Sequence, residues 1–162
     1  MLVARDRRGG RSRPEGEQAD RPPLPLPFDF VAVGVPLSVQ STSEAAVRRW
    51  QKVVADAARA AVPRRRGGYG PVADDVEATV AYFYQSRPLD TDNMIKPILD
   101  AIKGIVYIDD EQVVDVHAAV RAMHGTYDLS EVTNVLWQAI DAGEPFVYVR
   151  VRPLPQPLEV LP

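Results

Sequence analysis

Apolar positions along the chain change their spacing several times, and each change predicts a different element. Runs rich in β-branched residues or with loose alternation predict four strands, over residues 28–35, 76–84, 112–123 and 146–151. Apolar residues that recur every three or four positions predict three helices, over residues 43–61, 92–103 and 130–142. The helices alternate with the strands, in the order βαβαβαβ. This predicts a single α/β or α+β domain, with helices packed on a small mixed sheet.

Both ends of the chain differ in composition from this central part. Residues 1–27 combine Arg, Gly and acidic residues with a proline-rich stretch, which predicts a disordered arm. Residues 153–162 are also rich in proline and predict an extended tail. The folded domain is therefore expected over residues 28–152, a usual size for one domain.

Composition excludes several classes of chemistry. The 162 residues include no cysteine, so disulfides, zinc-thiolate sites and cysteine nucleophiles are excluded. The chain has no apolar run of the roughly 20 residues that a membrane span needs, and we expect a cytoplasmic, nucleoid-associated protein. Residues 1–21 hold six Arg and four acidic residues, leaving 13 basic and 18 acidic residues elsewhere, a net charge near -5. Such a balance disfavours non-specific nucleic-acid binding.

Acidic residues gather around the second predicted helix. At about 100° per residue, its apolar residues share one arc, and Asp92, Asn93, Lys96, Asp100 and Lys103 share the opposite one. Asp90 precedes the helix and Asp110 follows it, so the carboxylates of Asp90, Asp92 and Asp110 can converge. Three close carboxylates require a cation, and ligands that are all oxygen favour Mg²⁺ or Mn²⁺. This pattern predicts phosphoryl chemistry, with Lys96 as an additional positive charge.

Simpler interpretations of these residues exist. Taken singly, Asp92 can cap the helix, Lys96 can pair with it, and Asp100 can be solvated surface. Two other acidic motifs fail: an EF-hand loop needs Gly where Ile95 stands and Glu where Ala101 stands, and a haloacid-dehalogenase motif needs an apolar strand directly before Asp90.

The residues from Asp90 to Asp115 closely resemble the RusA-type Holliday-junction resolvases. The resemblance is carried by Asp90-x-Asp92-Asn93-x-x-Lys96-x-x-x-Asp100-Ala101, followed by Asp109-Asp110-x-Gln112-Val113-Val114-Asp115. It continues more weakly over residues 28–121. It implies a homodimeric, magnesium-dependent endonuclease that makes paired nicks across a four-way DNA junction.

The resemblance also implies roles for individual residues. Asp90, Asp92 and Asp110 would bind the metal, Lys96 would be the catalytic cation, and Asn93, Asp100 and Asp109 would support them. The segment 125–144 departs from the family pattern, because the chain there is expected to return sooner to its last strand. It predicts an inserted helix that remodels the DNA-facing surface or binds a protein partner.

Basic residues outside this segment are candidates for contacts with DNA phosphates. They are Arg64, Arg65 and Arg66 on a glycine-rich loop with Tyr69, together with Arg48, Arg49, Lys52 and Arg87. The alternative is a solvated charged loop. His117 and His124 are expected as strand residues rather than ligands, and Trp50 and Trp137 as core or interface anchors.

Two further hypotheses stay open at this stage. The protein can bind junctions or a partner without cutting, or it can cut other branched or single-stranded DNA.

Overall fold

The computed structural model describes residues 21–37, 43–86 and 91–155, without the side chain of Asp92. Every strand and helix predicted from the sequence is present, and the α+β class is confirmed. A short 3₁₀ turn, η1, is added before the third strand. The elements are β1 (Phe28–Val33), α1 (Glu44–Ala61), β2 (Val76–Tyr84), α2 (Thr91–Ile102), η1 (Asp110–Gln112), β3 (Val113–Ala122), α3 (Asn134–Ala142) and β4 (Phe146–Pro153).

The four strands form one mixed sheet in the order β1-β4-β2-β3. The last strand in the chain, β4, lies between β1 and β2 and runs antiparallel to both, with Val149 opposite Phe30 on one side and Val80 on the other. β3 runs parallel to β2. Parallel neighbours need a crossover connection, and α2 provides it.

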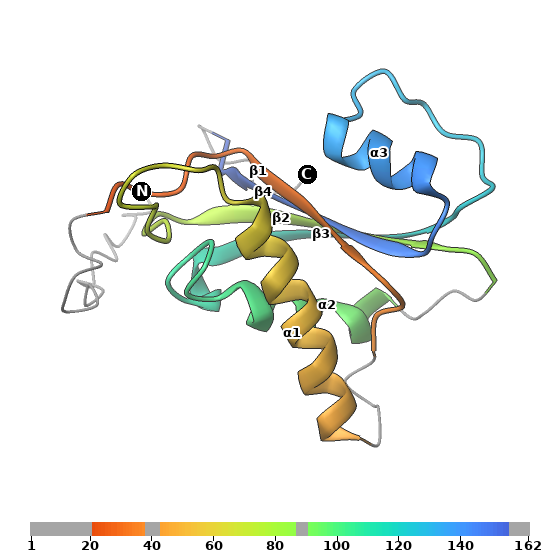
Figure 1. The fold of residues 1–162 in the computed structure, drawn as a ribbon, viewed down its shortest axis with the longest axis horizontal. Helices are drawn as coiled ribbons and strands as arrows, with labels where there is room; N and C mark the ends of the chain where they lie inside the picture. The colour runs from red at the N-terminus through yellow and green to blue at the C-terminus, as the bar shows by residue number, and fades with distance from the viewer. Residues whose placement is uncertain (1–20, 38–42, 87–90, 156–162) are drawn as a thin grey trace, which may run out of the picture.

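The helices cover the two faces of the sheet unequally. Figure 1 shows α1 and α2 on one face and α3 over the other. Strand side chains alternate between these faces. Phe30, Val80 and Val149 therefore join the larger core beneath α1 and α2, whereas Phe83 and Tyr148 join the smaller core beneath α3.

Helix α1 is fixed by a cap and by one apolar stripe. The Ser43 hydroxyl accepts a hydrogen bond from the Ala46 backbone N–H at 3.2 Å, which satisfies one of the free donors of the first turn. Trp50, Val54 and Ala58 are buried. Val53 was expected to face the core but is 43 % exposed, because it lies on the far side of Trp50 from the other two on the helix surface.

The segment 21–27 was expected to belong to the arm, but it packs against the domain. Leu24 is only 2 % exposed and lies in the larger core. Its N–H donates to the Gly70 carbonyl at 2.8 Å, and the Gly70 N–H donates to the Pro22 carbonyl at 2.9 Å. Residues 1–20 of the expected arm and 156–162 of the expected tail lie outside the described residues.

Candidate active site on the second helix

Helix α2 presents the two arcs that its sequence predicts. Met94, Ile98 and Ile102 are completely buried, whereas Lys96 lies on the exposed side. The helix begins at Thr91, one residue earlier than expected, so Asp92 stands within the first turn rather than before it.

Pro97 lies inside α2 and alters its hydrogen bonding. Proline has no backbone N–H, so it cannot donate to the carbonyl four residues earlier, which belongs to Asn93. The Asn93 carbonyl therefore lacks its ordinary helical partner. This carbonyl lies one residue from Asp92, on the turn that carries the predicted site.

A tight turn follows α2 and returns the chain toward it. Gly104 adopts a φ of 76°, in the left-handed region that glycine tolerates, and its N–H donates to the Tyr107 carbonyl at 2.7 Å. The buried Tyr107 hydroxyl donates to the Leu99 carbonyl at 2.7 Å, and burial, reinforced by the nearby Asp110 and Asp100, raises the pKa of this phenol. The turn therefore holds the residues just before Asp109 against the end of α2.

Gln112 fixes the backbone that carries Asp109 and Asp110. Its side chain is fully buried, and its Oε1 accepts from the N–H groups of Ile108 at 2.9 Å and Asp109 at 2.8 Å. Its Nε2 donates to the carbonyls of Val72 at 3.0 Å and Asp74 at 2.8 Å. One side chain thus satisfies four backbone groups and ties the acidic turn to the chain before β2.

A groove of about 360 Å³ lies between α2 and β3. Its polar lining is Lys96, Asp100 and Asp110, three residues predicted for the site, and its apolar wall is Ile95, Leu99, Val113 and Val116. The Lys96 Nζ lies 3.4 Å from Asp100 Oδ1. The fold therefore places the predicted cation and the Asp110 carboxylate on one surface.

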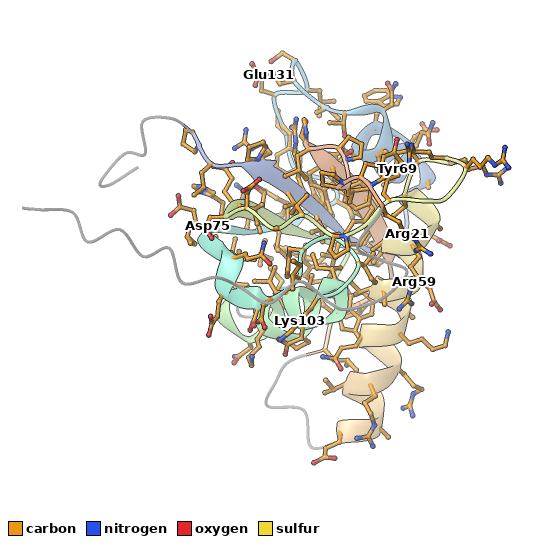
Figure 2. The ribbon with its side chains drawn as sticks, turned by 90° about the vertical axis from the view of Figure 1, so that its left-hand side faces the viewer. Arg21, Arg59, Tyr69, Asp75, Lys103 and Glu131 are labelled. Carbon is orange, nitrogen blue, oxygen red and sulfur yellow. The ribbon has the colours of Figure 1, made fainter. Side chains whose placement is uncertain are left out.

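Lys103 is an additional member of this cluster. It was expected on the polar arc of the helix, but no function was assigned to it. Its Nζ lies 3.0 Å from Asp109 Oδ1 and 3.5 Å from Asp110 Oδ1, and the pKa of Lys103 is raised, first by its hydrogen bond to Asp109. A hydrogen bond with the Asp110 side chain, followed by the Lys103 ammonium, lowers the pKa of Asp109 to about 2. Lys103 is labelled low on the molecule in Figure 2.

The metal prediction depends on residues that the structure describes only in part. Asp90 lies outside the described residues, as does the Asp92 side chain. Among the side chains that are described, no three acidic or histidine groups converge closely enough to hold a metal ion. Of the three predicted ligands the structure describes the Asp110 side chain, whose carboxylate has the hard oxygen chemistry that suits Mg²⁺.

The predicted arginine loop forms a separate surface. Arg64, Arg65 and Arg66 are exposed, and none of them lines the groove. The Arg65 guanidinium carbon lies 5.7 Å from the centre of the Tyr69 ring, a cation–π distance. Figure 2 shows Tyr69 and Arg21 close to one another and apart from Lys103. Arg21, which the sequence placed in the arm, therefore extends this basic surface.

Two other candidates for DNA contact are already paired on α1. Arg48 Nη1 lies 3.3 Å from Glu44 Oε2, and Lys52 Nζ lies 2.5 Å from Asp56 Oδ2. Arg49, one position along, is exposed. Arg87 lies outside the described residues.

The aromatic and histidine residues singled out in the sequence fall in different environments. Trp50 is buried in the larger core, as one of the two expected roles requires, whereas Trp137 on α3 is 53 % exposed. His117 lies on β3, as expected, while His124 lies in the turn just after it. Both imidazoles are on the surface.

Comparison with known proteins identifies the family. The model of the family described as Endodeoxyribonuclease RusA matches residues 37–152, which is most of the chain and includes both α2 and η1. The chain belongs to the RusA endodeoxyribonuclease family. A search of curated proteins found no match. Membership in RusA implies an endodeoxyribonuclease that acts on Holliday junctions, and the match includes the segment 125–144 that was expected to depart from the family pattern. No helix among the described residues is long and apolar enough to cross a membrane.

Proposed function

We propose that this RusA protein is a magnesium-dependent resolvase that cuts four-way DNA junctions by paired symmetric nicks. The observation that carries the proposal is the groove between α2 and β3, where Lys96 and Asp110 share one surface. An exposed ammonium beside carboxylates is the arrangement that a phosphodiester needs, since the acids suit a cation and the lysine suits the phosphate.

Asp90, Asp92 and Asp110 are the proposed metal ligands, with Mn²⁺ as a possible substitute for Mg²⁺. Such an ion supplies Lewis-acid polarisation of the phosphate and lowers the pKa of a water molecule. The protein's own groups do the rest. Lys96 stabilises negative charge that develops on the phosphate, and Asp100 holds the lysine side chain at 3.4 Å.

The supporting residues act on the acidic turn. Lys103 neutralises part of the negative charge of Asp109 and Asp110, which lowers their mutual repulsion. Gln112 fixes the backbone of the same turn through its bond to the Asp109 N–H.

The proposed protein acts as a homodimer. A four-way junction has two equivalent strands to cut, so two active sites related by a two-fold axis are required. Arg64, Arg65 and Arg66, with Tyr69, are the proposed phosphate contacts, since guanidinium groups bind phosphate with two parallel hydrogen bonds.

The test is cleavage of a synthetic four-way junction in the presence of Mg²⁺. Asp92→Asn and Asp110→Asn are each expected to reduce the cutting rate at least about 100-fold, because each removes a metal-binding charge. Asp141→Asn on the exposed surface of α3 is the matched control and is expected to cut like the unaltered protein.

Two results would redirect the proposal. Equal cutting by Asp92→Asn would remove the metal assignment. Tight junction binding without products, in either Mg²⁺ or Mn²⁺, would instead indicate a non-cleaving binding protein. A panel of flaps, forks and single strands separates a junction resolvase from a nuclease for other DNA.

A further inference from the structure

Strand β3 forms one end of the sheet, and its outer edge is open. Within the described residues it pairs with β2 alone. Val114 is 47 % exposed and Val116 is 42 % exposed, although their side chains are apolar. An edge strand of ten residues with exposed valines is a template for another strand.

The hydrogen bonds show which backbone groups of β3 point outward. The Met123 N–H donates to the Tyr84 carbonyl of β2 at 2.7 Å, so the N–H and carbonyl groups of odd-numbered residues face β2. From Val116 to Ala122, those of even-numbered residues face the open edge, and the register shift beside Val76 and Glu77 ends this alternation before Val114. In agreement, the Val120 carbonyl accepts a hydrogen bond from the Arg121 side chain at 3.1 Å rather than from β2.

We propose that β3 pairs antiparallel with β3 of a second copy of this chain, about a two-fold axis at Ala118. In this register Ala118 faces its own counterpart and Val116 faces Val120. Val116, Ala118 and Val120 have their backbone groups on the open edge, so reciprocal hydrogen bonds can form there. The Ala122 carbonyl, at the end of the pairing, already accepts a hydrogen bond from the Tyr127 hydroxyl at 2.6 Å.

Charge selects this register over its neighbours. With the axis at Ala118, Asp115 lies opposite Arg121 of the second copy at both ends of the pairing, a favourable cross-strand pair. Moving the axis by one residue places Asp115 opposite Ala119 or Met123. In the second of these registers Arg121 also faces His117. Only the proposed register matches every charged side chain with its opposite and leaves the valines facing apolar residues.

This pairing is also consistent with a two-site nuclease. The axis is perpendicular to the joined sheet, so the α1 and α2 layers of both copies lie on the same face. The two Val113 residues, which begin β3 beside each groove, would be ten residues apart along the strands, roughly 33 Å. The inference relies on the proposed homodimer for the identity of the partner, but not on DNA cleavage.

Single-cysteine crosslinking tests the register, because the natural chain has no cysteine. Ala118→Cys is expected to form a disulfide-linked dimer under mild oxidation, since paired Cα atoms about 5.5 Å apart suit a disulfide. Ala142→Cys, exposed on α3, is the control and should stay uncrosslinked. Val120→Cys alone should also stay monomeric on a non-reducing gel, but should crosslink when mixed with Val116→Cys.

Charge reversal tests the same interface by sedimentation and needs no disulfide. Asp115→Arg is expected to weaken the dimer roughly tenfold, because two attractive pairs become repulsive. Adding Arg121→Asp to the same chain restores opposite charges and should restore the dimer. A structural defect in Asp115→Arg would not be repaired by this second change.

The possible outcomes separate the interface from the function. A dimer in sedimentation that never crosslinks through position 118 would overturn the β3 interface and leave the proposed homodimer. A protein that is monomeric while it cuts junctions would overturn both. Crosslinking through position 118 in a protein that cuts no DNA supports the interface and counts against the nuclease.

Discussion

The two lysines at the candidate site differ in how they are held. Lys96 pairs with Asp100 one turn along the same helix, whereas Lys103 pairs with Asp109 and Asp110 from the following turn. The first contact has the helical spacing of four residues, although the sequence suggested Asp92, four residues before Lys96, as the partner rather than Asp100. The second depends on how the chain reverses at Gly104, which sequence spacing does not specify. The sequence therefore singled out Lys96 as a candidate and assigned no role to Lys103.

Lys96→Met is expected to reduce junction cutting on the order of 100-fold, because it removes a charge that stabilises the transition state. Its free energy of unfolding should change by only a few tenths of a kcal/mol, since the ion pair is exposed. Single-turnover cleavage and urea unfolding measure the two effects.

Asp100→Asn is the matched variant for this prediction. It breaks the same ion pair but keeps the ammonium, so cutting should decrease much less than in Lys96→Met. Equal losses in the two variants would indicate that the pair matters for structure and that Lys96 is not a catalytic cation.

Gln112 is the second residue whose role depends on the fold. In the sequence, Gln112 stood out only as part of the family motif, because a polar amide at the start of an alternating strand is usually exposed to solvent. Gln112→Leu should lower the free energy of unfolding by about 2–4 kcal/mol, because it leaves four backbone groups without partners. Thermal unfolding measures the loss.

Glu111→Gln, at the exposed neighbouring position, is the control for Gln112 and should unfold at the temperature of the natural protein. If Gln112→Leu were equally stable, the four hydrogen bonds would not be what holds the acidic turn.

At the scale of elements, periodicity predicted each strand and helix, because every element buries one regular face. It failed where an irregular segment is buried. Residues 21–27 contain mostly proline and lack any period, yet Leu24 inserts into the larger core and pairs with Gly70. Composition averages over all residues of such a segment. The burial of one side chain, Leu24, is enough to order it, and composition does not reveal that burial.

Leu24→Ala is therefore expected to destabilise the domain by about 2–5 kcal/mol, the usual result of truncating a buried leucine. Chemical denaturation measures this loss. Leu129→Ala, at a leucine that is 40 % exposed, is the control and should cost far less. Similar stability of the two variants would indicate that residues 21–27 belong to the arm and do not stabilise the domain.

The whole molecule separates its charges into two surfaces. The acidic groove lies between α2 and β3, and the arginine loop lies elsewhere, beside Arg21 and Tyr69 (Figure 2). The net charge near -5 over residues 22–162 therefore does not describe the local charge of the surface proposed to contact DNA. The sequence predicted both groups of residues but not their separation, which depends on the order of the strands.

Replacing Arg64, Arg65 and Arg66 together by Gln should weaken DNA binding and flatten its salt dependence. Each lost phosphate contact reduces the slope of log K against log salt by about 0.9, so three contacts give a change of up to about 2.7. Binding measured at several salt concentrations gives the slope.

A double variant with Arg48→Gln and Lys52→Gln is the comparison for the arginine loop. These two side chains already pair with Glu44 and Asp56, so the slope should change less per charge removed. A larger change in slope per charge removed in this variant would indicate that DNA contacts α1 rather than the arginine loop.

The central position of β4 has a consequence for synthesis of the chain. β1 and β2 touch each other only through β4, which comes after every other strand and helix in the sequence. During translation, the sheet therefore cannot form until residues 146–153 have left the ribosome. Until then β1 has no strand partner, apolar residues of the incomplete sheet stay exposed, and a nascent chain that pauses before Phe146 is a target for chaperones and proteases.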